Sequence, residues 1–245
     1  WGTANPDQPQ GPGWLGRYLD SLSGPIDPLV AWNTQRSTPG PLTGQRIGVP
    51  SITSPAGYGL TSPNGAAEAA RERAALVRMA SHLPWERPHV AFVNGTTQAA
   101  LGTLHRVATV SSYLPAVAYP NDGFVQALQA VAGAMARGIG TKVFWVQTGG
   151  YDTHAAQGVN QGGYFNLMAT LDGGVKAFHD DLRSQGLLNS TVVLVYTEFG
   201  RRIAENGSQG TDHGAGGVMM LLGGLVRGGL HGTAPNLAPD PANPT

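Results

Sequence analysis

Two apolar segments, KVFWVQT (142–148) and TVVLVYT (191–197), constrain the fold of this chain more than any other feature. Continuous apolar runs of this length are typical of strands that are buried on both faces of a parallel sheet. Apolar residues between the two segments recur at helical spacing and predict a helix over about 165–185. Because a strand, a helix and a second strand form a right-handed βαβ unit, we expect the two strands to be adjacent and parallel.

The rest of the chain is predicted to complete one α/β domain over residues 1–245, in which helices flank a mostly parallel sheet. Residues 1–63 are rich in Gly, Pro, Ser and Thr and form a loop-rich segment, with a short helix at 13–20 and a short strand at 46–50. Residues 64–140 form a helical segment. They begin with an alanine-rich helix, and a second helix follows at 96–114. A third helix follows the turn signal YPNDG. Residues 141–245 form the sheet core, with a third strand at 218–224.

Charge and composition exclude several classes of partner and site. Lys and Arg together number 15, and so do Asp and Glu, so the net charge of 0 argues against nucleic acid or an anionic membrane as a partner. The absence of cysteine excludes disulfides, thiol nucleophiles and thiolate metal ligands. No apolar run approaches the length of about 18 residues that a membrane span needs.

Polar clusters follow the two main apolar strands and precede the third. They are Asp152 with His154, Glu198 with Arg201, and Asp212 with His213. Ligands of open α/β sheets bind outside the carboxyl ends of strands, so we expect the three clusters to converge on one site. The alternative is that each acid caps a turn, and that Glu198 is the ion-pair partner of Arg201.

Carboxylate oxygens and imidazole nitrogens are ligands of divalent metal ions. We therefore predict a metal site built from the acids and histidines of the three clusters. Zn²⁺ is the first candidate, and Mn²⁺, Mg²⁺ and Ca²⁺ are alternatives. The planar guanidinium of Arg201 suits a phosphate or sulfate group, so this residue is the candidate catalytic group.

Three motifs in this order, GGYDTHAAQ, TEFGR and GTDHGAGG…LLGGLVRGGLHG, resemble the domain of unknown function 1501 family of bacterial proteins. The opening WGTANP…GWLGRYLD is similar to the middle section of that family. The family in turn resembles the alkaline phosphatase and sulfatase superfamily. Members of that superfamily have a parallel sheet between helices, one or two metal ions, and a nucleophilic hydroxyl or formylglycine.

The resemblance implies that Asp152 and His154 are a metal pair, that Glu198 stands at an acidic ligand position, and that His213 is a late ligand. Phe199 departs from the pattern, because a histidine is expected there. The implied activity is metal-dependent hydrolysis of small phosphate or sulfate esters by a periplasmic or secreted protein.

The segments that carry the nucleophile and a further ligand at the start of the family are not found, so we expect the chain to be incomplete and inactive by itself. The alternative is a non-catalytic secreted or envelope subunit that assembles with other protein subunits. The low share of charged residues, 12%, favours such packing.

Overall fold

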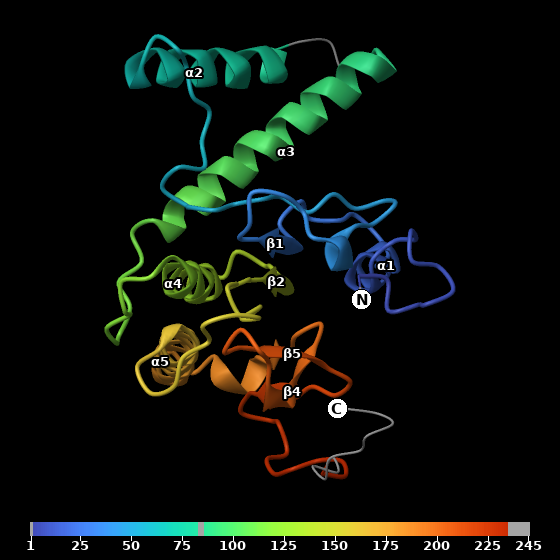
Figure 1. Cartoon of the computed structure of the whole chain (residues 1–245). Coiled ribbons are helices and arrows are strands. Elements are labelled where there is room, and N and C mark those ends of the chain that lie inside the picture. The colour runs from blue at the N-terminus through green and yellow to red at the C-terminus, as the bar shows by residue number, and fades with distance from the viewer. Residues whose placement is uncertain (1, 83–85, 235–245) are drawn as a thin grey trace. The chain divides into compact units, whose positions relative to one another are not determined.

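The computed structural model describes residues 2–82 and 86–234, and the chain divides into two compact units (Figure 1). Unit 1 consists of residues 1–114 and 130–147, and unit 2 consists of residues 115–129 and 148–245. The last part of the predicted sheet core, 235–245, lies outside the described residues. The prediction of a single domain stays a prediction.

Five helices and six short strands make the described part of the chain a mixed α/β protein. The helices are α1 (Trp14–Asp20), α2 (Ala66–His82), α3 (Pro88–Val110), α4 (Gly123–Ala136) and α5 (Gly163–Ser184). The strands are β1 (Ala31–Asn33), β2 (Val143–Trp145), β3 (Val193–Val195), β4 (Gly200–Glu205), β5 (Thr211–Gly214) and β6 (Met220–Leu222). Two 3₁₀ turns, η1 (Gly40–Leu42) and η2 (Leu188–Ser190), complete the elements. No helix among the described residues is long and apolar enough to cross a membrane.

The predicted helices are confirmed, but the predicted sheet is not found among the described residues. The strands form three two-stranded sheets, of which β1–β2 is parallel and β3–β6 and β4–β5 are antiparallel. The expected pairing of 142–148 with 191–197 is not shown among the described residues, in which β2 pairs with β1 and β3 pairs with β6. The strand predicted at 46–50 is not found; the next residue, Ser51, forms an isolated bridge with Asn33.

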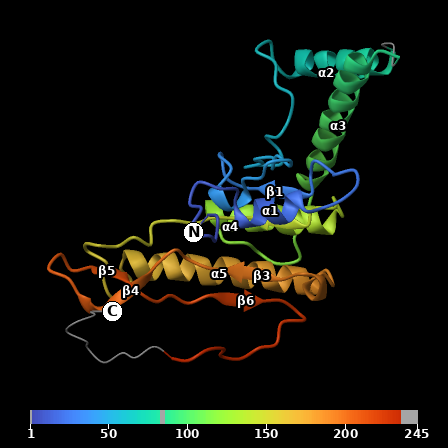
Figure 2. The same ribbon diagram turned by 90° about the vertical axis from the view of Figure 1, so that its right-hand side faces the viewer.

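The direction of the β3–β6 pair follows from what connects the two strands. A parallel neighbour requires a crossover, usually a helix, whereas an antiparallel neighbour needs only a return of the chain. The connection from β3 to β6 contains the β4–β5 hairpin and no helix, so β6 runs back beside β3 (Figure 2). The expected burial of these strands also fails: Leu194 of β3 is 39% exposed and Leu221 of β6 is 58% exposed.

Unit 2 is organised around the helix α5. Phe178 and Leu182 of its predicted apolar stripe are buried. Gly174 packs closely against α4, because a Cβ added at Gly174 would lie 2.9 Å from the side chain of Val125. The fully buried carboxylate of Asp181 accepts hydrogen bonds from the backbone N–H of Ala116 and from the hydroxyl of Tyr119. These contacts fix the segment before α4 against α5.

Unit 1 has its core around β1. Trp32 is fully buried and its indole N–H donates to the carbonyl of Ile52 at 2.9 Å. One core cluster consists of Leu29, Trp32, Ile52, Val107, Val110, Ala134 and Ile139. A second cluster, on the other side of the strand, consists of Leu19, Val30, Ala31, Leu42 and Val49. Ala31 and Trp32 are consecutive residues of β1 and point to opposite faces of the strand, so each face is covered by one cluster.

The end of α1 is tied to the following loop by the carboxylate of Asp20. Its oxygens accept the backbone N–H groups of Gln45 at 2.6 Å, Arg46 at 2.9 Å and Ile47 at 3.0 Å. The hydrogen bond from Gln45 lowers the pKa of Asp20 below its usual value of 3.8, and the bonds from Arg46 and Ile47 act in the same direction, while partial burial opposes them.

We expect Asp20→Asn to lower the free energy of unfolding by about 1–3 kcal/mol at pH 7, because an amide group cannot accept all of these N–H groups. Because the pKa of Asp20 is lower in the folded chain than in the unfolded chain, its ionised carboxylate stabilises the fold. This contribution to the free energy of unfolding is complete above the unfolded pKa of about 3.9 and is lost as the pH falls through the folded pKa. The difference between wild type and variant in urea unfolding should therefore shrink below about pH 4. Asp7→Asn, at an exposed position, is the control and should change little. Equal stability of wild type and Asp20→Asn at pH 7 would show that the contact contributes nothing.

Candidate metal centre

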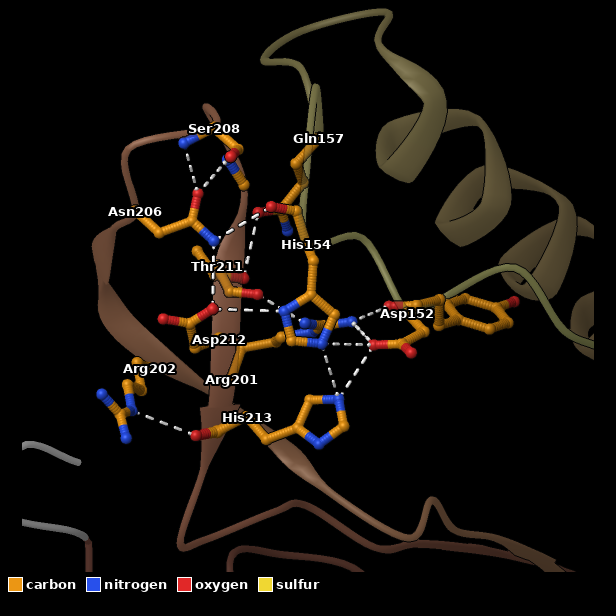
Figure 3. A network of polar contacts seen from close by, with 12 residues as sticks. Asp152, His154, Gln157, Arg201, Arg202, Asn206, Ser208, Thr211, Asp212 and His213 are labelled. Carbon is orange, nitrogen blue, oxygen red and sulfur yellow. Dashed lines mark hydrogen bonds and ion pairs between the residues drawn. The ribbon is translucent and has the colours of Figure 1, made fainter.

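The candidate site lies in unit 2 and is built from the loop 150–158 and the β4–β5 hairpin (Figure 3). In the hairpin, Arg201 pairs with His213 and Gly200 pairs with Gly214, and the register shifts before Glu205 pairs with Thr211. Paired residues of an antiparallel ladder project on the same face, so the side chains of Arg201 and His213 lie side by side. The loop that carries Asp152 and His154 lies against this hairpin.

Backbone hydrogen bonds attach the loop to the hairpin. The N–H of Thr211 donates to the carbonyl of Thr153 at 3.2 Å, and the N–H groups of Ala156 and Gln157 donate to the turn carbonyls of Ser208 and Gln209 at 3.0 and 2.9 Å. This pairing places residues of two distant segments at fixed positions. It is the reason that Asp152 and His154 come close to His213.

A glycine is required at position 210 for this attachment. Gly210 is buried, and a Cβ at this position would lie 2.3 Å from the backbone carbon of His154. No carbon side chain fits at that distance, so any other residue would push the loop away from the hairpin. At Gly207, in the same turn, a Cβ would have no atom within 4 Å, and φ lies outside the left-handed region.

Three potential ligand atoms meet at this junction. Oδ1 of Asp152 lies 3.0 Å from Nε2 of His154 and 2.8 Å from Nε2 of His213, and the two nitrogens are 3.1 Å apart. Bonds of about 2.0–2.1 Å to a common metal ion place adjacent ligand atoms about 3 Å apart. The two imidazoles and the carboxylate therefore fit one divalent ion. The three side chains are 45–59% exposed.

Arg201 lies beneath this junction and is mostly buried, with 14% of its side chain exposed. Its guanidinium donates to the carbonyls of Thr211 and Tyr151 and to Oδ1 of Asp152, the last at 3.0 Å. The hydrogen bond from His213 contributes most to lowering the pKa of Asp152, and Arg201 and the nearby His154 lower it further against a partial desolvation. These contacts favour the ionised form of Asp152 and hold the orientation of its carboxylate.

Phe199 fixes the ring of His213. The two rings are stacked, with centroids 3.8 Å apart and an angle of 10° between their planes, and the guanidinium carbon of Arg201 lies 4.8 Å from the centre of the Phe199 ring. Arg201 is the strand partner of His213, and Phe199 lies two residues before Arg201. Side chains two residues apart project on the same face, so Phe199 lies on the face of His213. Sequence analysis noted Phe199 only because a histidine is expected at this position, and it did not predict the stacking on His213.

Asp212 lies close to the ligand atoms but contacts the far side of His154. Its Oδ1 is 3.2 Å from Nδ1 of His154 and accepts the side-chain amide of Asn206 at 3.1 Å. These two hydrogen bonds, the one from Asn206 first, lower the pKa of Asp212 against a partial desolvation. Sequence reasoning missed Asn206 at this site, although Asn206-Gly207 is a typical hairpin signal.

The structure thus brings together five of the six residues that the sequence selected. Asp152, His154, Asp212 and His213 share one network, and Arg201 donates into it. Glu198 is exposed on the bend before β4, and the potential metal ligands that cluster in the described part of the chain do not include it. The prediction that Glu198 is a metal ligand stays a prediction, and the position of Glu198 outside the cluster does not favour it.

A family profile described as "Protein of unknown function (DUF1501)" matches residues 2–245. The chain belongs to this family. The family resemblance read from the three motifs is therefore confirmed, and it covers nearly the whole chain. No curated protein and no solved structure matches the chain.

We expect Gly210→Ala to lower the free energy of unfolding by about 1–3 kcal/mol, because the added methyl group overlaps the backbone of His154. Amide hydrogen exchange at Ala156 and Gln157 should become faster, since these N–H groups donate to the displaced turn. Gly207→Ala is the matched control in the same turn and should leave both measurements unchanged. Unchanged exchange at Ala156 and Gln157 in Gly210→Ala would contradict the close approach.

Proposed function

We propose that this chain carries a divalent metal centre of the kind that hydrolyses phosphate or sulfate esters, with Asp152, His154 and His213 as the protein ligands. The observation that carries the proposal is the meeting of their three ligand atoms at 2.8–3.1 Å. Zn²⁺ suits this mixture of nitrogen and oxygen donors, and the same set also binds Mn²⁺ or Fe²⁺.

The number of ligands and their exposure favour a reactive centre over a structural one. Structural zinc sites are closed by four protein ligands, whereas catalytic sites have three and an open position. The described part of the chain offers three ligands that lie together, and about half of each side chain is exposed. A small anionic ester can therefore reach the site. When bound, the metal supplies a positive charge that polarises an ester oxygen.

The residues around the ligands support this chemistry by fixing the ligands in place. Arg201 uses its N–H groups on two carbonyls and on Asp152, so we propose that it holds Asp152 in the direction of the metal. Its predicted role in binding the ester anion would require it to release these acceptors. The proposal that the family is related to the alkaline phosphatase and sulfatase superfamily is supported by the order of the motifs and by the acid and histidine ligands.

We further propose that this chain hydrolyses such esters weakly or not at all. Covalent hydrolysis requires a hydroxyl that a neighbouring base activates. The hydroxyl nearest to the ligands in sequence, that of Thr153, is buried and has no hydrogen-bond partner in the described part of the chain. It therefore has no base beside it among those residues.

The second candidate function is a non-catalytic subunit that assembles with other proteins. The observation in its favour is the exposure of apolar side chains on β3 and β6, such as Leu194 and Leu221. Failure of the folded chain to bind any divalent metal would favour this role over the first.

We expect the chain to bind one Zn²⁺, as measured by isothermal titration calorimetry and by metal analysis of the dialysed protein. Asp152→Ala, His154→Ala and His213→Ala should each weaken binding by more than about 100-fold, because each removes one ligand. Glu198→Ala is the matched control, since this acid is exposed outside the cluster, and its affinity should stay within about twofold of wild type. An equal loss in Glu198→Ala, or no binding by the wild type, would contradict the proposed ligand set.

We expect the zinc- or manganese-loaded chain to hydrolyse 4-nitrophenyl phosphate and 4-nitrophenyl sulfate less than about 10-fold faster than Asp152→Ala, because the hydroxyl of Thr153 has no hydrogen-bonded base among the described residues. Initial rates measured at saturating metal test this expectation. Substantial turnover that is lost in Asp152→Ala and in His213→Ala would show that the chain is an active hydrolase as it stands.

A further inference from the structure

His154 lies between two carboxylates, and its two ring nitrogens face different partners (Figure 3). Nε2 faces the ligand cluster, 3.0 Å from Oδ1 of Asp152 and 3.1 Å from Nε2 of His213. Nδ1 faces away from the cluster and lies 3.2 Å from Oδ1 of Asp212. Neighbouring residues of β5, Asp212 and His213, therefore approach opposite sides of one imidazole.

Both carboxylates compete for the proton of a neutral His154. Asp152 lies 3.0 Å from Nε2 but already has Arg201 and Nε2 of His213 as hydrogen-bond partners, whereas Asp212 lies 3.2 Å from Nδ1. An ionised carboxylate only accepts hydrogen bonds, so a favourable contact at 3.2 Å requires the proton on Nδ1. A neutral imidazole carries one proton, so Nε2 then has a free lone pair. Nε2 is the atom that faces Asp152 and His213, and a metal ion binds only such an unprotonated nitrogen.

Asp212 is itself held in place by the hairpin turn. The side-chain N–H₂ of Asn206 donates to Oδ1 of Asp212 at 3.1 Å and to the backbone carbonyl of His154 at 2.9 Å. The side-chain oxygen of Asn206 accepts the backbone N–H groups of Ser208 at 2.9 Å and Gly210 at 3.1 Å. Asn206 thus links the turn, Asp212 and the backbone of His154 into one rigid unit.

The contacts of Asp212 also argue against its being a ligand of the same ion. The potential ligand atoms that lie together in the described residues come from Asp152, His154 and His213, and Asp212 is not among them. Its Oδ1 already accepts from Asn206 and His154. Carboxylates placed behind a histidine ligand in this way fix the ring and raise its basicity.

We propose that Asp212 is a positioning residue that holds His154 with its proton on Nδ1 and with Nε2 free to bind the metal. The inference rests on the proposed metal centre, and it replaces the sequence prediction that Asp212 is a ligand. His213 has no corresponding carboxylate in the described part of the chain, and its ring is held by stacking on Phe199. The two histidine ligands are thus oriented by different interactions, so a change at Asp212 should act directly on the tautomer of His154.

The test compares wild type, Asp212→Ala and Asp212→Asn, with Asp7→Asn as the exposed control of equal charge change. The full chain is labelled with ¹⁵N-histidine, and long-range ¹H–¹⁵N spectra are recorded without metal near pH 8, where unperturbed histidines are neutral. Signals of His154 are assigned by their absence in His154→Gln. Zn²⁺ affinity is measured on the same proteins by competition with a chromophoric chelator, and urea unfolding verifies that each variant is folded.

In wild type we expect the His154 signals of the Nδ1–H form. Asp212→Ala should lose this form and bind Zn²⁺ about 10- to 100-fold more weakly, which is the usual effect of removing such a partner. Asp212→Asn retains an acceptor oxygen and should lie between the two. Asp7→Asn should match wild type in both measurements.

Two results would overturn the inference. One is that His154 keeps the same tautomer in Asp212→Ala. The other is a loss of zinc affinity in Asp212→Ala as large as in Asp152→Ala, which would make Asp212 a ligand. Lack of zinc binding by the wild type would instead refute the metal centre, while the spectra without metal would still decide whether Asp212 orients His154.

Discussion

The backbone pairing between the loop 150–158 and the β4–β5 hairpin turn is the interaction on which the site depends. Asp152 and His154 lie far from His213 in the sequence, and no regular strand pairing joins their segments in the described part of the chain. The N–H groups of Ala156, Gln157 and Thr211 supply the connection instead, and Gly210 allows the two backbones to approach. A site made in this way is set by backbone hydrogen bonds, which position the three proposed ligands in the chain itself.

Around this junction each proposed ligand is fixed by a different kind of contact. Asp152 accepts a hydrogen bond from the mostly buried guanidinium of Arg201, and His213 stacks on Phe199. His154 is held by the carboxylate of Asp212. Preorganised ligands lose little freedom on binding a metal, which favours affinity even at an exposed site.

The sequence predicted the helices better than the sheet. Helical spacing of Leu171, Val175, Phe178 and Leu182 identified α5, because the pattern is local. The partners of 142–148 and 191–197 could not be read in the same way, since strand pairing depends on segments far apart in the chain, such as β1 and β6. The clusters around Asp152 and His213 lie together as expected, but through backbone contacts between a loop and a hairpin and not at the edge of the predicted sheet. The contributions of Asn206 and Gly210 were missed, since they act through the backbone of a turn.

The most direct test of the proposed metal centre is a crystal structure of the chain grown with Zn²⁺, with diffraction data collected on both sides of the zinc absorption edge. We expect one anomalous peak at about 2.0–2.2 Å from a carboxylate oxygen of Asp152 and from Nε2 of His154 and of His213. Asp212 should not be a ligand of that ion. A peak bound by other residues, or no peak at this junction in a crystal that contains zinc, would contradict the proposed centre.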